Sequence, residues 1–322
     1  MRLAREGNLR AVALSAVWHH GSRAQDDLPP LRRAVVAADA EGIRPVLAVY
    51  QFSSSTPADA SSRAAFVAYL EALARGLPDV HDVIVGNEPN LNLFWQPQFD
   101  NGGDAAARAY ESLLAQAYDA LKGVDPGIDV IGGALAPRGG DRPSIRPTHS
   151  PTRFLLDLGA AYRASGRAKP IMDELSIHVY GESPRIPPTL AHPHTTSIGI
   201  ADYQKLVHLL GEAFDGTAQP GASLPIVYGE YGVESVIPAA KRSLYTGSEV
   251  VHPVDEQTQA RFYEEAIGLA ACQPTVRMLL LFHVVDEPRL EGFQSATRYA
   301  DGSPKSSYEP VRAAAGRGCT RG

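Results

Sequence analysis

Three observations predict an α/β fold with a parallel sheet. Apolar strand candidates recur roughly every 30 to 50 residues, and the segments between them have the apolar spacing of helices. The longest irregular stretches, residues 89–103, 137–151, 181–197 and 235–253, each follow a strand candidate. Strands that alternate with helices pair in parallel, and a (β/α)8 (TIM) barrel carries its long loops after its strands. We therefore predict a TIM barrel formed by a single domain over residues 1–322.

Seven strands of the predicted barrel can be recognised as short apolar runs. They begin near Ala11, Ile43, Val83, Ile128, Ile171, Pro225 and Val276. Helices are predicted over residues 29–41, 56–77, 110–121, 152–164, 200–214, 256–271 and 308–315. Thr56 and Pro57 are typical of a helix start, because a threonine side chain can cap the first turn and proline is tolerated in it.

A (β/α)8 barrel needs eight strands, one more than the sequence shows. The first candidate, at Ala11, is preceded by residues 1–6, which have the pattern of a helix end, and by Gly7. We expect that the first barrel strand and a signal peptide lie upstream of this start and are missing from it. A seven-stranded or otherwise altered barrel is the alternative.

The charge and hydropathy of the chain argue against two classes of partner. The formal net charge is −6 and the isoelectric point is about 5.9, which disfavours nucleic acid and anionic membrane surfaces. No run reaches the roughly 18 apolar residues that a membrane-spanning helix requires.

The two cysteines, Cys272 and Cys319, are 47 positions apart, and the second lies in a glycine-rich tail where packing does not call for it. A disulfide between them would tie down the last helix and contribute about 4 kcal/mol on the chain-entropy model. It would also imply an oxidising, extracytoplasmic location. The alternative is two unrelated thiols.

Two apolar strands end in a glutamate that is followed by a strand-breaking proline or by a Tyr-Gly pair. They are residues 83–90, which contain Glu88, and residues 224–232, which contain Glu230. A carboxylate at the mouth of a buried strand costs free energy unless it is paired or hydrogen-bonded. The two acids can face each other only if the fold brings these two strand ends together.

Four segments resemble the barrel strands of clan A glycoside hydrolases. The run Gly-Asn-Glu-Pro-Asn at 86–90 is similar to that clan's Asn-Glu-Pro signature on the fourth strand, and Tyr-Gly-Glu-Tyr-Gly at 228–232 to its nucleophile strand, the seventh. Residues 176–180 resemble the sixth strand and 281–283 the eighth. The matches lie in the right order over residues 11–315 and most resemble families 5 and 39. The resemblance implies a secreted, retaining glycosidase that acts on β-linked sugars.

The resemblance also implies the catalytic roles. Glu88 would be the general acid/base and Glu230 the nucleophile, with carboxyl groups roughly 5–5.5 Å apart, against about 6.5–9.5 Å in an inverting enzyme. An ionised Glu230 would raise the pKa of Glu88 and keep it protonated for the first step. Asn87 would bind the sugar 2-hydroxyl, and Tyr180 or Tyr231 would donate to Glu230. The alternative for both glutamates is capping or ion pairing at strand ends.

Further side chains are candidates for binding the sugar. His178 is expected to orient either carboxylate. Trp95 would stack on a sugar ring or simply anchor its loop, and Trp18 would line the pocket at the end of its strand. His283 stands with Phe282 where relatives commonly carry a tryptophan on the eighth strand.

The chain departs from the family pattern on its first recognised strand. Relatives carry an arginine there that pairs with the nucleophile, but this chain has Ala13 at that position, and its nearest arginine, Arg10, is at the far end of the strand. The departure leaves two other functions open. One is a non-catalytic carbohydrate-binding protein on the same scaffold, and the other is a structural or interaction protein of the cell wall.

No cofactor and no metal ion are expected, and the predicted partner is an oligosaccharide, polysaccharide or glycoside. The loop histidines His192 and His194, taken with His149 or His252, lack the close spacing with a carboxylate or cysteine that is typical of metal sites.

Overall fold

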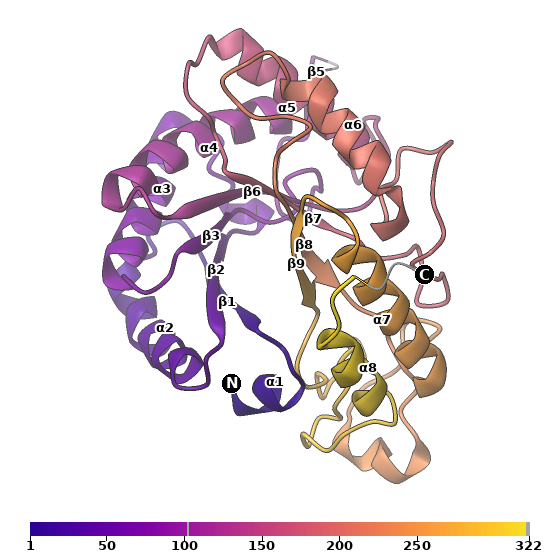
Figure 1. The fold of residues 1–322 in the computed structure, drawn as a ribbon. Helices are drawn as coiled ribbons and strands as arrows, with labels where there is room; N and C mark the ends of the chain where they lie inside the picture. The colour runs from indigo at the N-terminus through magenta and orange to yellow at the C-terminus, as the bar shows by residue number, and fades with distance from the viewer. Residues whose placement is uncertain (102, 320–322) are drawn as a thin grey trace.

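A curled sheet of parallel strands forms the centre of the computed structural model, which describes residues 1–101 and 103–319 (Figure 1). Its seven described strands are hydrogen-bonded in the order β1 (Ala11–Val17), β2 (Arg44–Tyr50), β3 (Asp82–Val85), β6 (Asp129–Leu135), β7 (Glu174–His178), β8 (Ile226–Tyr231) and β9 (Val276–Leu281). The order in the sheet is the order in the chain, as in a TIM barrel. The predicted fold is therefore confirmed, with seven strands in the described residues. That residues 1–322 form one domain stays a prediction.

The helices lie on the outer side of the sheet and follow its curvature (Figure 1). They are α1 (Arg2–Glu6), α2 (Ala24–Asp39), α3 (Ala60–Gly76), α4 (Ala105–Val124), α5 (Pro151–Ser165), α6 (Tyr203–Phe214), α7 (Glu256–Ala271) and α8 (Tyr308–Ala315). Short 3-10 turns lie in three of the loops, at η1 (Ser53–Ser55), η2 (Ile200–Asp202) and η3 (Ala239–Leu244). A two-stranded hairpin, β4 (Phe99–Asp100) with β5 (Gly103–Asp104), interrupts the loop after β3.

Three predicted helix starts are wrong by four or five residues. Helix α4 begins at Ala105 rather than at residue 110, because the Asp104 side chain caps it by accepting from the backbone N–H of Ala107. Helix α3 begins after Asp59, because the Asp59 carboxylate accepts hydrogen bonds from the backbone N–H groups of Ser61 and Ser62. The Thr56 hydroxyl instead donates to the Ser53 carbonyl, 3.0 Å away. Helix α2 begins at Ala24, five residues before the predicted start, with acidic residues in its first turn that favour the positive end of the helix dipole.

Apolar side chains fill both sides of the sheet. Between sheet and helices lies a large continuous core that includes fully buried Phe66, Tyr110 and Phe154. The barrel interior holds a smaller cluster, made of Val46, Ile84, Ile131, Ala134 and Val227. Beside this cluster the interior is open along β1, where Ala13 and Ser15 are exposed and border the cleft described below.

The sheet has two free edges, because β1 and β9 are its first and last strands and each is hydrogen-bonded on one side only. In the described residues no strand lies between them. Helix α1 and residues 7–10 precede β1. A sheet with seven strands is one of the two outcomes that the sequence left open, and the expectation of a further upstream strand stays a prediction.

Ion pairs neutralise the acids at the amino ends of the strands, where TIM barrels concentrate residues that serve stability. Arg44 pairs with Asp82 and, at 3.7 Å, with Asp129. Arg277 pairs with Asp129 at 3.3 Å and with Glu174. Two arginines thus hold three carboxylates at the end of the barrel opposite to Glu88 and Glu230.

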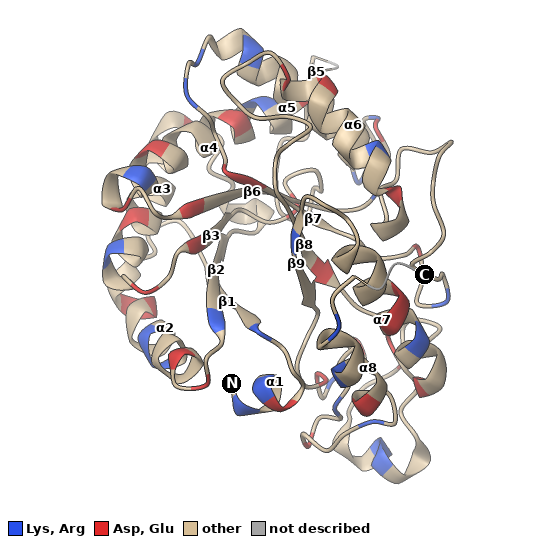
Figure 2. Ribbon diagram, viewed as in Figure 1, with Lys and Arg blue, Asp and Glu red and all other residues tan. Residues whose placement is uncertain are grey.

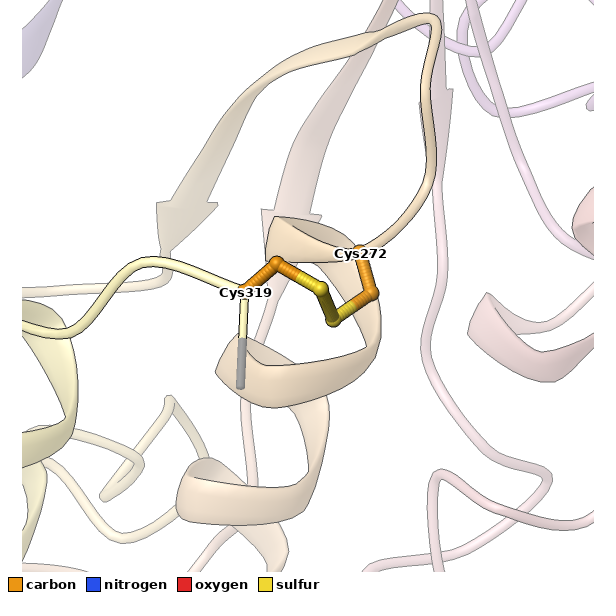
Figure 3. Close-up of a disulfide and its surroundings, with 2 residues drawn as sticks. All are labelled: Cys272 and Cys319. Carbon is orange, nitrogen blue, oxygen red and sulfur yellow. A yellow bond between two sulfur atoms is a disulfide. The ribbon is translucent and has the colours of Figure 1, made fainter. Parts of the chain in front are cut away.

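A disulfide joins Cys272, just after α7, to Cys319, beyond α8 (Figure 3). Their Cα atoms are 4.7 Å apart, so the predicted pairing is confirmed. Disulfides are typical of proteins in oxidising compartments, and an extracytoplasmic location is consistent with this bond. Secretion itself stays a prediction.

Replacing both Cys272 and Cys319 by serine should lower the free energy of unfolding by about 4 kcal/mol, because the unfolded chain would lose its cross-link across 47 positions. Urea unfolding followed by circular dichroism measures this change. The oxidised wild type should lose the same stability when it is treated with a reductant, whereas the double serine variant should not respond. Equal urea midpoints for the oxidised wild type and the variant would contradict the prediction.

Charged residues of both signs are interspersed along the outer helices, and neither sign dominates one side of the view (Figure 2). The net charge of −6 is therefore spread rather than concentrated. Among the described residues, no helix combines the length and the apolar character that crossing a bilayer demands.

Candidate active site

A cleft of about 1030 Å³ opens at the carboxyl ends of the strands. It is lined by seven of the nine residues that the sequence singled out: Asn87, Glu88, His178, Tyr180, Glu230, Tyr231 and His283. They come from the ends of β3, β7, β8 and β9, which are far apart in the chain. A cleft of this size is within the range that binds small organic ligands.

Glu88 is held by an unusual stretch of backbone directly after β3. Gly86 has a φ angle of 83° and Glu88 one of 39°, and the backbone N–H of Glu88 donates to the carbonyl of Ala134 at 2.8 Å. Positive φ is uncommon for a residue with a side chain and occurs preferentially at functional sites. A side chain at Gly86 would also approach the ring of Tyr110 to 3.1 Å. The turn thus requires glycine at 86 and directs Glu88 into the cleft.

His178 lies between the two glutamates. Its Nδ1 atom is 2.9 Å from Oε1 of Glu88 and 3.4 Å from Oε2 of Glu230. Because both oxygens are this close to one nitrogen, the two carboxyl groups border the same part of the cleft. The fold therefore brings together the two acids that the sequence placed 142 positions apart, with His178 in contact with both.

The pKa of His178 is set by burial and by the two neighbouring glutamates. The side chain is almost fully buried, which alone would lower its pKa, but the negative charge of Glu230 and the hydrogen bond to Glu88 outweigh burial and leave the pKa raised. Among the described residues, His178 is the one basic side chain within 4 Å of the Glu230 carboxylate. It takes the place beside Glu230 at which the sequence lacks the expected arginine.

Of the two tyrosines expected to donate to Glu230, Tyr180 does so, with its hydroxyl 3.0 Å from Oε2. Tyr231 borders the cleft, but its side chain is buried and packs edge-on against Tyr263. Neighbouring side chains on a strand point to opposite faces, so the residue after Glu230 faces the helices. The expectation of Tyr231 as a donor is therefore wrong.

Burial raises the pKa of Glu230 above its ordinary value, and the nearby charge of Glu88 adds to the effect. His178, the Tyr180 hydroxyl and His283 act in the opposite direction. Burial also raises the pKa of Tyr180 well above its usual range, so this hydroxyl stays a donor.

Two predicted sugar contacts, Trp95 and Trp18, are wrong. Trp95 is fully buried with its ring edge-on to Tyr110, and Trp18 packs in the same way against Phe66. Neither is among the described residues that line the cleft. Large aromatic rings gain more by joining the core than by pointing into solvent, so Trp95 anchors its loop, the alternative that the sequence had left open.

Three phenylalanines that line the cleft, Phe52, Phe94 and Phe293, were missed in the sequence. Phe52 and Phe94 stack at 5.4 Å between ring centroids on one side. Phe293 lies edge-on to Phe282, which in turn stacks on His283 at 4.1 Å. Phe52 and Phe293 are exposed, at 38% and 40%, which is unusual for large apolar residues and was not visible in their sequence context.

The loop histidine His192 is held by carboxylates rather than grouped with other histidines. It contacts Asp202 at 2.7 Å and Glu182 at 2.9 Å. His194 and His252 are outside the clusters of potential metal ligands found in the described residues, whereas His149 belongs to one of them. No cofactor is implied by the residues around the cleft.

The comparisons with known proteins concern the fold. No protein-family model and no curated protein matches the chain. Among solved structures, it is similar to the GH39 enzyme of Xanthomonas axonopodis pv. citri, with a TM-score of 0.59 and 17% identity over 96% of this chain and 60% of that one. It is similar to a monomeric beta-xylosidase of Caulobacter crescentus CB15, with a TM-score of 0.59 and 18% identity over 97% of this chain and 62% of that one. It is also similar to a glucosidase from Croceicoccus marinus, with a TM-score of 0.62 and 15% identity over 98% of this chain and 61% of that one.

The chain spans about 60% of the length of these three structures and is nearly covered by each of them. At such low identity the likeness establishes the arrangement of strands and helices rather than an activity. The chain has the TIM-barrel fold shared by GH39 and related glycoside hydrolases, with seven sheet strands in its described residues.

Proposed function

We propose that this protein is a retaining glycosidase that hydrolyses β-linked sugars, with Glu88 as general acid/base and Glu230 as nucleophile. The observation that carries the proposal is the pair of carboxyl groups at one cleft, both in contact with His178. Two acids at this spacing suit the two sides of a single anomeric carbon. The fold likeness to a GH39 enzyme, a beta-xylosidase and a glucosidase supports a carbohydrate substrate.

In the first step, the Glu230 carboxylate would attack the anomeric carbon while protonated Glu88 gives its proton to the leaving oxygen. An ester between the sugar and Glu230 forms, and the aglycone leaves as an alcohol. In the second step, ionised Glu88 would take a proton from water, whose oxygen displaces Glu230 from the sugar. Both residues return to their starting states, and the configuration at the anomeric carbon is retained.

The neighbouring side chains have roles that follow from their contacts. The Tyr180 hydroxyl stabilises negative charge on Glu230 before attack, and the contact with His178 orients Glu88. Asn87, which lines the cleft beside Glu88, is placed to bind a sugar hydroxyl. Phe52 and Phe293 offer exposed apolar faces on which sugar rings can stack.

A covalent trap tests the proposal. A panel of activated 2-deoxy-2-fluoro-β-glycosides (xyloside, glucoside and glucuronide) should include one that raises the intact mass of the protein by a single glycosyl group. Peptide mapping should place that group on Glu230. Proton NMR of the corresponding aryl β-glycoside should show the β-sugar as the first product. An α-sugar as the first product, or no modified protein and no hydrolysis across the panel, would contradict the proposal.

A non-catalytic carbohydrate-binding protein is the second candidate, and one observation favours it. Among the described residues no arginine or lysine lies within 4 Å of Glu230, whose pKa is raised chiefly by burial, so less of it is ionised than in an ordinary glutamate. Calorimetric binding of xylo- or gluco-oligosaccharides without any turnover of aryl glycosides would favour this candidate.

Replacing Tyr180 by phenylalanine should move the acidic limb of the pH–kcat/KM profile upward. Activity requires ionised Glu230, and the Tyr180 hydroxyl lowers the pKa of that carboxyl through its hydrogen bond. Its loss removes stabilisation of the anion and should raise the limb by about one pH unit. Tyr231→Phe is the matched control, because the buried Tyr231 side chain packs against Tyr263 instead, and its limb should stay in place. If the acidic limbs of the two variants lay at the same pH, the hydrogen bond from Tyr180 to Glu230 would have no effect on activity and the prediction would be contradicted.

A further inference from the structure

We propose that Asp104, His149 and Asp157 form a binding site for a divalent transition-metal ion of the zinc class. The three side chains lie outside the cleft, where α4 and α5 begin side by side. One potential ligand atom from each lies within 4.8 Å of the other two. Asp104 and His149 are more than nine-tenths buried, and Asp157 is partly exposed and leaves a path for an ion.

The hydrogen bonding of His149 fixes which ring nitrogen is free. Its Nε2 atom is 3.0 Å from the backbone carbonyl of Gln98, an acceptor that brings no proton, so Nε2 must carry the hydrogen. In the neutral ring Nδ1 then presents a bare lone pair. Neither Nδ1 nor Oδ2 of Asp104 has a hydrogen-bond partner among the described residues, although both are buried.

The distance between these two buried atoms is 3.4 Å. An ion pair with a shared hydrogen would close to about 2.7–2.9 Å. Two ligands of one tetrahedral zinc ion, each bonded at about 2.0 Å, are separated by about 3.3 Å. The observed spacing therefore matches two ligands of one ion better than a hydrogen bond.

The rest of the cluster leaves ligand positions free. Oδ1 of Asp104 caps α4 by accepting from the backbone N–H of Ala107, so Oδ2 can bind an ion alone. Arg153 holds Oδ2 of Asp157 at 2.6 Å and does not occupy the other oxygen. One imidazole and two carboxylates are a donor set that suits zinc-class ions, with a fourth position left for water.

An ion at this site would brace the turn that carries Glu88. The backbone of His149 exchanges hydrogen bonds with Asn90, at 2.9 Å to the Asn90 carbonyl and 3.0 Å from the Asn90 amide. The Gln98 side chain donates to the carbonyl of Pro89 at 2.9 Å. Fixing the His149 ring would thus restrict residues 89–98, which follow Glu88 directly.

Equilibrium dialysis of the chelator-treated protein against Zn²⁺ should show one ion bound per chain. Co²⁺ should bind at the same place and give the visible absorption of a tetrahedral complex, which an imidazolium–carboxylate pair cannot produce. Hydrogen exchange in residues 89–98 should slow when Zn²⁺ is bound. These readouts do not depend on glycosidase activity, so their failure would leave the proposed function standing.

Asp157→Asn is the decisive variant, because Asp157 is the most exposed of the three ligands. It should weaken Zn²⁺ binding by at least about 100-fold, judged against the 10- to 100-fold effects of residues that only support a ligand. Asp129→Asn is the matched control, since Asp129 belongs to the acidic cluster that Arg44 and Arg277 neutralise, and it should leave binding unchanged. Absence of stoichiometric binding by the wild type would overturn the proposal, and so would unchanged binding by a folded Asp157→Asn protein.

Discussion

Glu230→Gln should reduce kcat for any glycoside that the wild type hydrolyses by on the order of 10⁴-fold or more, the scale seen when a nucleophile is removed. The amide is isosteric with the acid but does not form the glycosyl ester. Because the Tyr180 hydroxyl can still donate to the amide oxygen, the cleft should keep its shape and KM should change little. Steady-state kinetics with aryl β-glycosides measures both constants.

The control for this variant is Glu182→Gln, which alters another glutamate of the same cleft that contacts His192 rather than His178. Its kcat should stay within a few-fold of the wild type. If Glu230→Gln retained most of the wild-type kcat, Glu230 would not be the nucleophile, and the assignment of the two acids would have to be abandoned.

Glu88→Ala should separate the two steps of the reaction. For substrates with a poor leaving group, kcat should fall by about 10²–10⁴-fold, because proton donation by a positioned acid contributes on that scale. Aryl glycosides with an activated leaving group need little protonation, so their first step should be nearly normal and the glycosyl-enzyme should accumulate as a burst.

Azide distinguishes the role of Glu88 from a structural one. As a small anion that needs no general base, it should enter the space left by the side chain, attack the glycosyl-enzyme and restore turnover with a β-glycosyl azide as product. The same addition should not rescue Glu230→Gln, where no glycosyl-enzyme forms. Equal losses for good and poor leaving groups, without azide rescue, would show that Glu88 acts only in stability or binding.

The strand and helix pattern of the fold could be predicted because it depends on local chemistry. Strand β8, for example, begins with the apolar run Ile226, Val227 and Tyr228, since both faces of a parallel barrel strand are buried. The residues at which helices begin were harder to predict than the helices themselves. Asp59 caps α3 in preference to Thr56 because its carboxylate reaches two backbone N–H groups, and that choice depends on chain geometry rather than on residue type.

In the candidate site, too, some residues could be predicted from the sequence and others could not. Glu88 and Glu230 were found because an acid at the end of an apolar strand is conspicuous. The wrong assignments are Trp95, Trp18 and Tyr231 as contacts. They concern which way a side chain faces, which is set by packing partners distant in sequence such as Tyr110, Phe66 and Tyr263. Phe52, Phe94 and Phe293 were missed for the same reason.

The unpaired sides of β1 and β9 affect local opening of the sheet and therefore amide hydrogen exchange. Amide groups without a neighbouring strand are protected only by their surroundings, so exchange with solvent deuterons should be faster in Val276–Leu281 than in the fully flanked Glu174–His178. Leu9, Arg10 and Leu279 border the cleft at this seam. Water entering along it would reach the floor of the cleft from the side, a route that a closed ring of strands would block.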